Sequence, residues 1–294
     1  MQRKGVHNMA LRAKKPTASM RRLKLMIWGE SGTGKTTAVM QMKKPFIIDT
    51  ERGTENYYKE INKVGGVVMH TTDIFEVIEE IKKLSTEKHD FCTLSLDSST
   101  ILYYELLEMM EEKHGTEFGI HFRKAGEVFK RMINLMMRLD MNIIITAHSK
   151  VMYGDNMKKI GDTFDTWKRI DYMFDLVLQL KKVTPTKRYV TVKKTRIEKF
   201  PDGDTFEWTY DSLKERYSQT ELERQADTIT VVTDEQLAEI EVLSTKLAEG
   251  KDFVDKCLRK AKVTQPADLT TEQAQLMIDH FIKSLGLETV GAMK

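Results

Sequence analysis

A glycine-rich turn over residues 29–36 has the spacing of a phosphate-binding loop. It reads GESGTGKT, follows the apolar run 23–28 and precedes a segment, 35–42, that we expect to be helical. In such a loop the main-chain N–H groups point at phosphate oxygens, the lysine reaches the β- and γ-phosphates, and the final hydroxyl binds Mg²⁺. The pattern therefore predicts a site for a nucleoside triphosphate with Mg²⁺. The expected nucleotide-binding residues are Gly29, Ser31, Gly32, Thr33, Gly34, Lys35, Thr36 and Thr37.

Two carboxylates are expected beside this loop. Glu51 follows one buried apolar run and Asp97 follows another. Since the carboxyl ends of parallel strands face one crevice, both side chains should lie near the phosphates. Glu51 could polarise the water that attacks the γ-phosphate, and Asp49 is the alternative for this role. Asp97 could hold Mg²⁺ together with the Thr36 hydroxyl.

A histidine and a pair of cations could respond to the γ-phosphate from further along the chain. His148 follows the apolar run 141–147, where it could sense the γ-phosphate or, alternatively, cap its strand through a hydrogen bond. Lys194 and Arg196 fall on one side of an expected strand because side chains alternate across a sheet. Such paired cations suit stabilisation of a γ-phosphate bound to a neighbouring subunit, and a charged edge strand facing solvent is the alternative.

Alternating strands and helices must position these residues. Continuous apolar runs predict buried strands at 23–28, 45–49 and 141–147, and a fourth strand is expected at 91–96, where the residues alternate less cleanly. Helical periodicity fills the segments 73–85, 100–113 and 124–139. The alternation predicts an α/β fold with a mainly parallel sheet that has helices on both faces. Runs typical of strands at 173–180, 189–194 and 206–210 predict an antiparallel extension on one edge.

Charge and composition suggest four parts of the 294-residue chain. Residues 1–22 carry seven Lys or Arg and no acid, which predicts a flexible basic arm that could engage nucleic acid or, alternatively, be a solvated disordered leader. The core is expected at 23–212 and a linker or helix at 213–235. A small helical module is expected at 236–294, with capping residues ahead of its apolar helices.

The apolar content limits the classes of protein that the chain can be. Hydrophobic residues make up 40% of the sequence, enough for a substantial core, yet no apolar run is long enough to cross a membrane. The N-terminus lacks a secretory apolar segment, and Cys92 and Cys257 lack the spacing of metal ligands. These features predict a cytoplasmic protein without a membrane partner.

The order of these motifs resembles the ATPase core of the RecA-like recombinases. A phosphate loop, a strand ending in Asp-Thr-Glu, a strand ending in Asp-Ser, a strand with a polar sensor and a Lys-x-Arg strand follow one another over residues 20–212. The chain looks most like the phage-encoded AAA-family ATP-binding proteins of RecA-like fold, some of which are single-strand-annealing recombinases. The resemblance implies a RecA-like P-loop NTPase core that hydrolyses ATP with Mg²⁺ as a filament or ring, in the host cytoplasm if phage-encoded.

The resemblance also implies roles for single residues. Glu51 becomes the water-activating base, and His148 stands where the family has a glutamine sensor, which is a departure from its pattern. Lys194 and Arg196 match the paired cations that act across the subunit interface. Tyr58 falls where the family stacks an aromatic ring on adenine, and Tyr57 could serve instead.

The family binds DNA through two mobile loops, which we expect at 113–124 and 149–169. Both segments interleave aromatic rings with cations, and ring stacking with phosphate contacts is the usual chemistry of single-strand binding. Long polar loops that merely become ordered in the oligomer are the alternative. The residues expected to contact DNA are Phe118, Phe122, Arg123, Lys124, Lys150, Tyr153, Lys158, Lys159, Trp167 and Lys168.

The favoured hypothesis is a DNA-dependent ATPase that binds single-stranded DNA and promotes annealing or recombination as an oligomer. A single-strand-binding protein is a further candidate partner. A helicase-like or packaging-type DNA motor is one alternative. A nucleotide-switched scaffold or loader with little turnover is the other.

Overall fold

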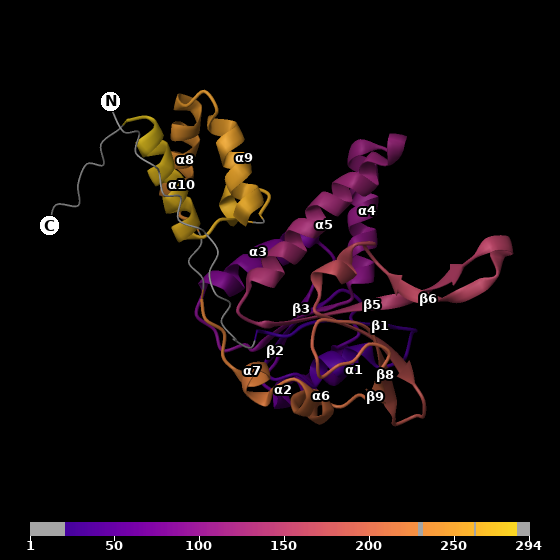
Figure 1. Ribbon diagram of the computed structural model, residues 1–294. Coiled ribbons are helices and arrows are strands. Elements are labelled where there is room, and N and C mark those ends of the chain that lie inside the picture. Colours follow the sequence, from indigo (N-terminus) through magenta and orange to yellow (C-terminus); the bar gives the residue numbers. More distant parts are fainter. Residues whose placement is uncertain (1–20, 229–231, 262, 287–294) are drawn as a thin grey trace, which may run out of the picture.

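The computed structural model describes residues 21–228, 232–261 and 263–286 (Figure 1). Within them, a nine-stranded sheet has the order β3-β2-β4-β5-β1-β7-β8-β9, and β6 pairs with β5 outside this path. Strands β1 to β5 and β7 are parallel, whereas β6, β8 and β9 run antiparallel to their neighbours. The predicted α/β fold with an antiparallel edge is therefore confirmed. The strands are β1 (Lys24–Gly29), β2 (Pro45–Asp49), β3 (Val67–His70), β4 (Thr93–Asp97), β5 (Asn142–Tyr153), β6 (Lys159–Asp165), β7 (Leu176–Lys182), β8 (Arg188–Thr195) and β9 (Thr205–Glu207).

Helices cover both faces of the sheet and form a separate group at the C-terminal end (Figure 1). Helices α3, α4 and α5 contribute to the apolar core on one face. Helices α1, α2, α6 and α7 contribute to the core on the other face, which explains why the central strands are buried on both faces. The helices of this core are α1 (Lys35–Met40), α2 (Tyr58–Lys63), α3 (Ile74–Thr86), α4 (Ser99–His114), α5 (Ile120–Arg138), α6 (Tyr210–Arg216) and α7 (Gln219–Glu223). Short 3₁₀ turns lie at Glu55–Tyr57, Glu117–Gly119, Asp155–Met157, Ile170–Met173 and Pro266–Asp268.

The two long loops expected at 113–124 and 149–169 are wrong as descriptions of the backbone. In the first segment α4 runs to His114 and α5 begins at Ile120, so only a tight turn remains. Gly115 and Gly119 take positive φ angles of 71° and 67° in this turn, which glycine adopts without steric cost. In the second segment, β5 continues past the sheet and pairs with β6 in a projecting hairpin. Its side chains are mostly exposed, so neither apolar run nor clear alternation marked these strands.

The C-terminal helices α8 (Asp234–Lys246), α9 (Gly250–Ala261) and α10 (Thr271–Ser284) share an apolar core of their own. The expected capping residues are confirmed, because Thr233 with Gln236 and Thr270 with Gln273 form reciprocal capping boxes. Asp268, ahead of α10, connects this group to α5. Both carboxylate oxygens of Asp268 accept bonds of 2.7 Å from the guanidinium of Arg131.

Several expected segments fall partly outside the described residues. These are residues 1–20 of the basic arm, 229–231 of the linker, and 262 and 287–294 of the helical module. Arg22, which we assigned to the arm, is buried, and its Nε donates to Asp140 Oδ1 at 3.1 Å. Contacts of the core therefore begin before the expected boundary at residue 23. In the part of the chain that the structure describes, every helix is too short or too polar to cross a membrane.

Candidate nucleotide site and aromatic groove

The phosphate loop connects β1 to α1 and is shaped by its glycines. Gly32 and Gly34 take φ angles of +71° and +96°, where a side chain would be strained. Lys35 Nζ donates to the main-chain oxygens of Gly29 and Glu30 at 3.1 and 3.0 Å. Burial lowers the pKa of Lys35, and the charges of the nearby carboxylates act in the opposite direction. The lysine is thus held at the loop, close to where phosphates would lie.

Asp97 lies at the end of β4 and is almost completely buried. The Thr36 hydroxyl donates to Asp97 Oδ2 at 2.5 Å, and the Thr146 hydroxyl donates to Oδ1. Burial raises the pKa of Asp97, while the two hydroxyl bonds lower it. A bound cation would favour the ionised carboxylate.

The oxygen donors of Thr36 and Asp97 fit Mg²⁺, which prefers oxygen ligands and often keeps water and substrate phosphates as further ligands. Among the described residues, His, Cys, Asp and Glu side chains form no cluster of three or more that could hold a metal ion. Thr36 and Asp97 would hold Mg²⁺ together with nucleotide phosphates and water. This is the usual arrangement in phosphate-loop proteins.

Glu51 lies in the loop after β2 and faces His148 at the neighbouring strand end. Glu51 Oε1 and His148 Nε2 are 2.7 Å apart, and the Ser98 hydroxyl donates to the same oxygen. The His148 hydrogen bond is the largest cause that lowers the pKa of Glu51, and burial opposes it. Glu51 is thereby held as a carboxylate, the form that can accept a proton from water.

Asp49, the alternative base, is occupied by the loop that follows it. Its carboxylate accepts the N–H groups of Glu51, Gly53 and Thr54 at 3.0, 3.3 and 2.9 Å, and the Thr54 hydroxyl at 2.5 Å. Because Asp49 is buried and fixes this turn, the geometry favours Glu51 for the contact with water.

A pocket of about 470 Å³ surrounds the phosphate loop. Tyr57 lines it, whereas the Tyr58 hydroxyl lies 2.9 Å from His70 Nε2 outside the pocket lining. Gly29 and Thr33 line a second pocket on the other side of the loop instead. The pocket-lining residues are Ser31, Gly32, Gly34, Lys35, Thr36, Thr37, Glu51, Gly53, Tyr57, Asp97, His148, Ser149 and Arg188.

Arg188 is the cation of this pocket that sequence reasoning missed. It begins β8, which pairs antiparallel with the end of β7 through Lys182 and Arg188. The chain reversal around Pro185 therefore returns Arg188 to the edge of the sheet where the phosphate loop lies. The turn at Pro185 was the available signal, but the strand was expected to begin one residue later, at 189.

Lys194 and Arg196 lie at the opposite edge of the sheet from the phosphate loop. Lys194 Nζ donates to the main-chain oxygens of Asp171 and Phe174, and burial lowers the pKa of Lys194. Arg196 Nη1 pairs with Asp175 Oδ1 at 3.1 Å, next to the start of β7. Within one chain the structure does not bring these cations to the nucleotide pocket. Their action across a subunit interface stays a prediction.

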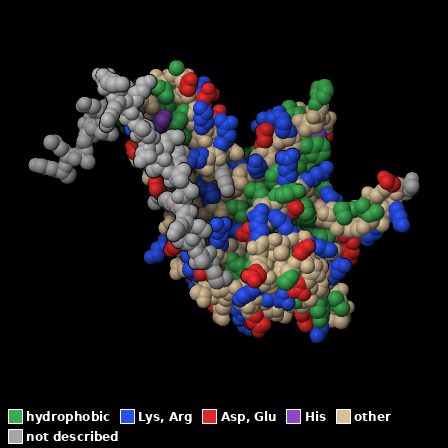
Figure 2. All heavy atoms as spheres, viewed as in Figure 1, with side chains coloured by type: hydrophobic (Ala, Val, Ile, Leu, Met, Phe, Trp, Pro, Cys, Tyr) green, Lys and Arg blue, Asp and Glu red, His purple; other side chains and the backbone are tan. Residues whose placement is uncertain are grey.

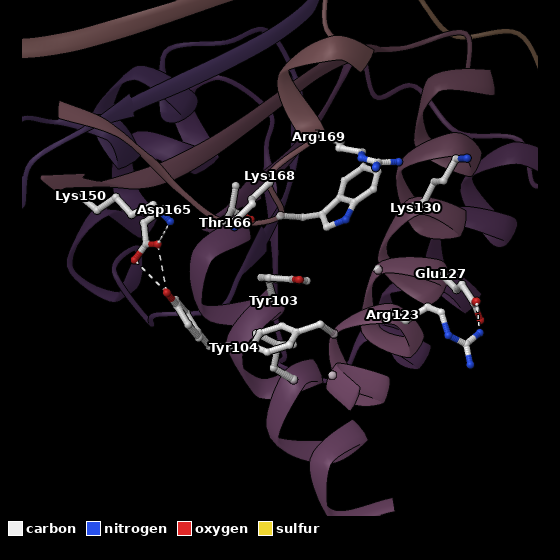
Figure 3. A pocket seen from close by; sticks show the side chains of 15 residues that line it. Tyr103, Tyr104, Arg123, Glu127, Lys130, Lys150, Asp165, Thr166, Lys168 and Arg169 are labelled. Carbon is white, nitrogen blue, oxygen red and sulfur yellow. Dashed lines mark hydrogen bonds and ion pairs between the residues drawn. The ribbon is translucent and has the colours of Figure 1, made fainter. Parts of the chain in front are cut away.

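A groove of about 700 Å³ lies between α4, α5 and the segment that follows β6 (Figure 3). Five of the expected DNA-binding residues line it: Phe122, Arg123, Lys150, Trp167 and Lys168. The sequence did not indicate Tyr103, Tyr104, Lys130 and Arg169, which line it as well. Figure 2 shows hydrophobic and cationic side chains together on this part of the surface.

The other expected DNA-binding residues lie outside the lining of the groove. Phe118 is fully exposed in the turn between α4 and α5. Tyr153, Lys158 and Lys159 lie near the tip of the β5–β6 hairpin, where Lys159 pairs with Asp162. Lys124 is on α5, 3.5 Å from Glu127. A role of these five residues in binding DNA stays a prediction.

Asp165 connects the groove to the nucleotide pocket. Its carboxylate accepts Tyr104 Oη at 3.0 Å and Lys150 Nζ at 2.8 Å, the bonds drawn in Figure 3. Its main-chain oxygen accepts the Thr100 hydroxyl at 2.6 Å, and that hydroxyl accepts the N–H of His148 at 2.8 Å. His148 in turn contacts Glu51, so hydrogen bonds and one strand join the two sites.

Comparison with known proteins agrees with this arrangement. A family model described as "AAA domain" matches residues 21–205, which is more than half of the chain. The match spans β1 to β8 and the first residue of β9, and with them the whole nucleotide pocket. No curated protein matches the chain significantly.

Proposed function

This chain belongs to the AAA domain family, and on that premise we propose that it hydrolyses ATP and couples hydrolysis to binding of single-stranded DNA. An AAA domain implies ATP binding, typically with Mg²⁺. The observation that carries the finer proposal is the common strand β5. It presents His148 to the nucleotide pocket and Lys150, two residues later, to the groove.

The nucleotide pocket supports hydrolysis through a small number of side chains. Lys35 binds the β- and γ-phosphates, and Glu51 accepts a proton from the water that attacks the γ-phosphorus as the bond to ADP breaks. His148 orients Glu51 and holds it ionised. Thr36 and Asp97 would hold Mg²⁺, which would supply charge neutralisation at the phosphates.

The groove supports binding of single-stranded rather than duplex nucleic acid. Tyr103, Tyr104, Phe122 and Trp167 offer aromatic faces, and unstacked bases are the form of DNA that can lie against them. Arg123, Lys130, Lys150, Lys168 and Arg169 offer cations for the phosphates. Stacking of one base on an aromatic side chain contributes roughly 1–3 kcal/mol.

The motif order supports the remaining parts of the proposal. These are annealing or recombination by a filament or ring, with Lys194 and Arg196 acting at a neighbour's γ-phosphate. We also propose that the protein is phage-encoded, acts in the host cytoplasm and has a single-strand-binding protein as a partner. In such an assembly each phosphate loop would be half of an active site that the next subunit completes.

ATP hydrolysis with and without single-stranded DNA tests the proposal. We expect hydrolysis that single-stranded DNA stimulates and duplex DNA does not, loss of nucleotide binding in Lys35→Ala, and a fall of about 100-fold in kcat in Glu51→Gln. Phe122→Ala should weaken DNA binding, whereas Phe75→Ala, a partly exposed phenylalanine on α3, should not.

Three outcomes would contradict the proposal. A rate of ATP hydrolysis that neither single-stranded nor duplex DNA changes would contradict the proposed coupling to DNA binding. Unwinding of a tailed duplex without annealing would favour a motor. ATP binding without turnover, unaffected by Glu51→Gln, would favour a switched scaffold or loader.

A further inference from the structure

Arg188 lies against the phosphate loop, and in the sheet order its strand lies on the other side of β1 from β2, the strand that Glu51 follows. Arg188 Nε is 3.0 Å from the point that a Cβ on Gly34 would occupy, so the guanidinium packs on the main chain just ahead of Lys35. Strand β8, which carries it, is separated from β1 by β7 in the sheet order. Glu51 follows β2, Asp97 ends β4 and His148 lies on β5, and these three strands lie on the other side of β1.

The guanidinium is held in place without being neutralised. Arg188 Nη1 donates to the main-chain oxygens of Thr184 and Pro185 at 3.2 and 3.1 Å, which fixes the side chain on its own turn. In the described part of the chain, Arg188 forms no ion pair, and its Nε and Nη2 make no hydrogen bond. A half-buried cation with free donors facing a phosphate pocket suits an anionic ligand, because charged hydrogen bonds to phosphate are the strong ones.

We infer that Arg188 binds the diphosphate part of the nucleotide, the part that ADP and ATP share. This inference rests on the proposed function, since it assigns a further residue to the same nucleotide site. Which phosphates Arg188 contacts depends on the side from which it approaches the pocket. The γ-phosphate would lie toward Glu51 and Asp97, whereas Arg188 reaches Gly34 from β8, on the other side of β1 in the sheet order. Arg188 is thus a binding residue that serves nucleotide retention within one subunit.

Calorimetric titration with Mg-ADP and Mg-ATP tests the inference, with ATP measured in the Glu51→Gln background to prevent turnover. We expect Arg188→Ala to raise Kd about tenfold for both nucleotides, which corresponds to about 1.4 kcal/mol. Arg188→Lys should lose less, because it keeps the charge but not the planar fork. In steady-state hydrolysis KM should rise by a similar factor, and kcat should stay within about twofold.

Lys187→Ala is the matched control, because Lys187 is the adjacent cation but pairs with Glu207 outside the pocket. Its two Kd values should equal those of the wild type. Arg188→Gln, which retains amide donors for the turn carbonyls but no charge, replaces Arg188→Ala if thermal unfolding shows that the alanine variant does not fold. The Arg188→Gln variant should raise the Kd for both nucleotides to a similar extent.

Two results would overturn the inference: wild-type affinity for both nucleotides in the Arg188 variants, or a loss confined to ATP, which would place Arg188 at the γ-phosphate. Failure of the proposed function looks different. In that case the wild type itself binds no nucleotide, and Lys35→Ala changes nothing.

Discussion

At the scale of residues, Glu51 and Asp97 are carboxylates whose surroundings move their pKa values in opposite directions. Asp97 is buried, and burial raises its pKa, whereas the His148 hydrogen bond lowers the pKa of Glu51. Environments that separate the pKa values of two acids commonly divide their roles. Here Glu51 is suited to accept a proton and Asp97 to balance a cation. Because the hydrogen bond to Glu51 comes from His148, this division of roles depends on β5, the strand that carries the histidine.

Removal of the His148 side chain should shift the pH dependence of hydrolysis. A lowered pKa keeps Glu51 ionised to lower pH, so the acidic limb of kcat in the wild type should lie below the ordinary glutamate value of 4.5. His148→Ala removes the largest cause of that lowering, so the limb should move to higher pH and kcat should fall about tenfold. His148→Gln restores a hydrogen-bond donor and should return the limb part of the way. Identical pH–kcat profiles in all three proteins would mean that the contact does not control Glu51.

At the scale of elements, the sequence predicts the strands that are buried on both faces of the sheet and misses the strands that are not. The central strands are buried along their length, and their expected carboxyl ends correctly predicted that Glu51, Asp97 and His148 would lie near the phosphate loop. Strand β3 at the edge is only four residues long and begins at the exposed Val67, so its apolar run is short, and β6 projects from the sheet and has no such run. The groove combines side chains of α4, α5 and the hairpin, an arrangement that only tertiary packing determines.

The contact between Asp268 and α5 should hold the C-terminal helices on the core. Asp268 is 2% exposed and accepts two bonds from Arg131, while its main-chain oxygen accepts Arg138. Removing one partner of a buried pair typically costs about 3–5 kcal/mol, because the other charge is left without compensation. Asp268→Ala should therefore make the C-terminal helices much more sensitive to limited proteolysis while ATP binding is retained. The control is Asp279→Ala, which removes an exposed carboxylate on α10 and should be cleaved at the wild-type rate. Equal cleavage of the wild type and both variants would contradict the role of Asp268.

At the scale of the whole molecule, one strand joins the two candidate sites. Strand β5 passes from the centre of the sheet to His148 at the nucleotide pocket and then to Lys150 at the groove. Asp165 on the partner strand β6 pairs with His148 in register and holds Lys150 and Tyr104 with its carboxylate. A phosphate that binds Lys150 must compete with Asp165 for that cation. DNA bound in the groove can thus change the hydrogen bonds that connect the main-chain oxygen of Asp165, through the Thr100 hydroxyl, to the N–H of His148.

Asp165→Asn should separate binding of single-stranded DNA from stimulation of hydrolysis. The amide keeps the shape of the side chain but not its charge, so Lys150 is released for phosphate and DNA affinity should rise about threefold. Basal hydrolysis should stay within about twofold, because Asp165 does not line the nucleotide pocket. Stimulation by DNA should fall toward the basal rate, since phosphate binding no longer draws Lys150 away from a charged Asp165, the residue whose main-chain oxygen is connected to the His148 N–H through Thr100. Asp162→Asn, on the same strand but paired with Lys159 instead, is the control and should keep the wild-type stimulation. Full stimulation in Asp165→Asn would show that the two sites communicate by another route.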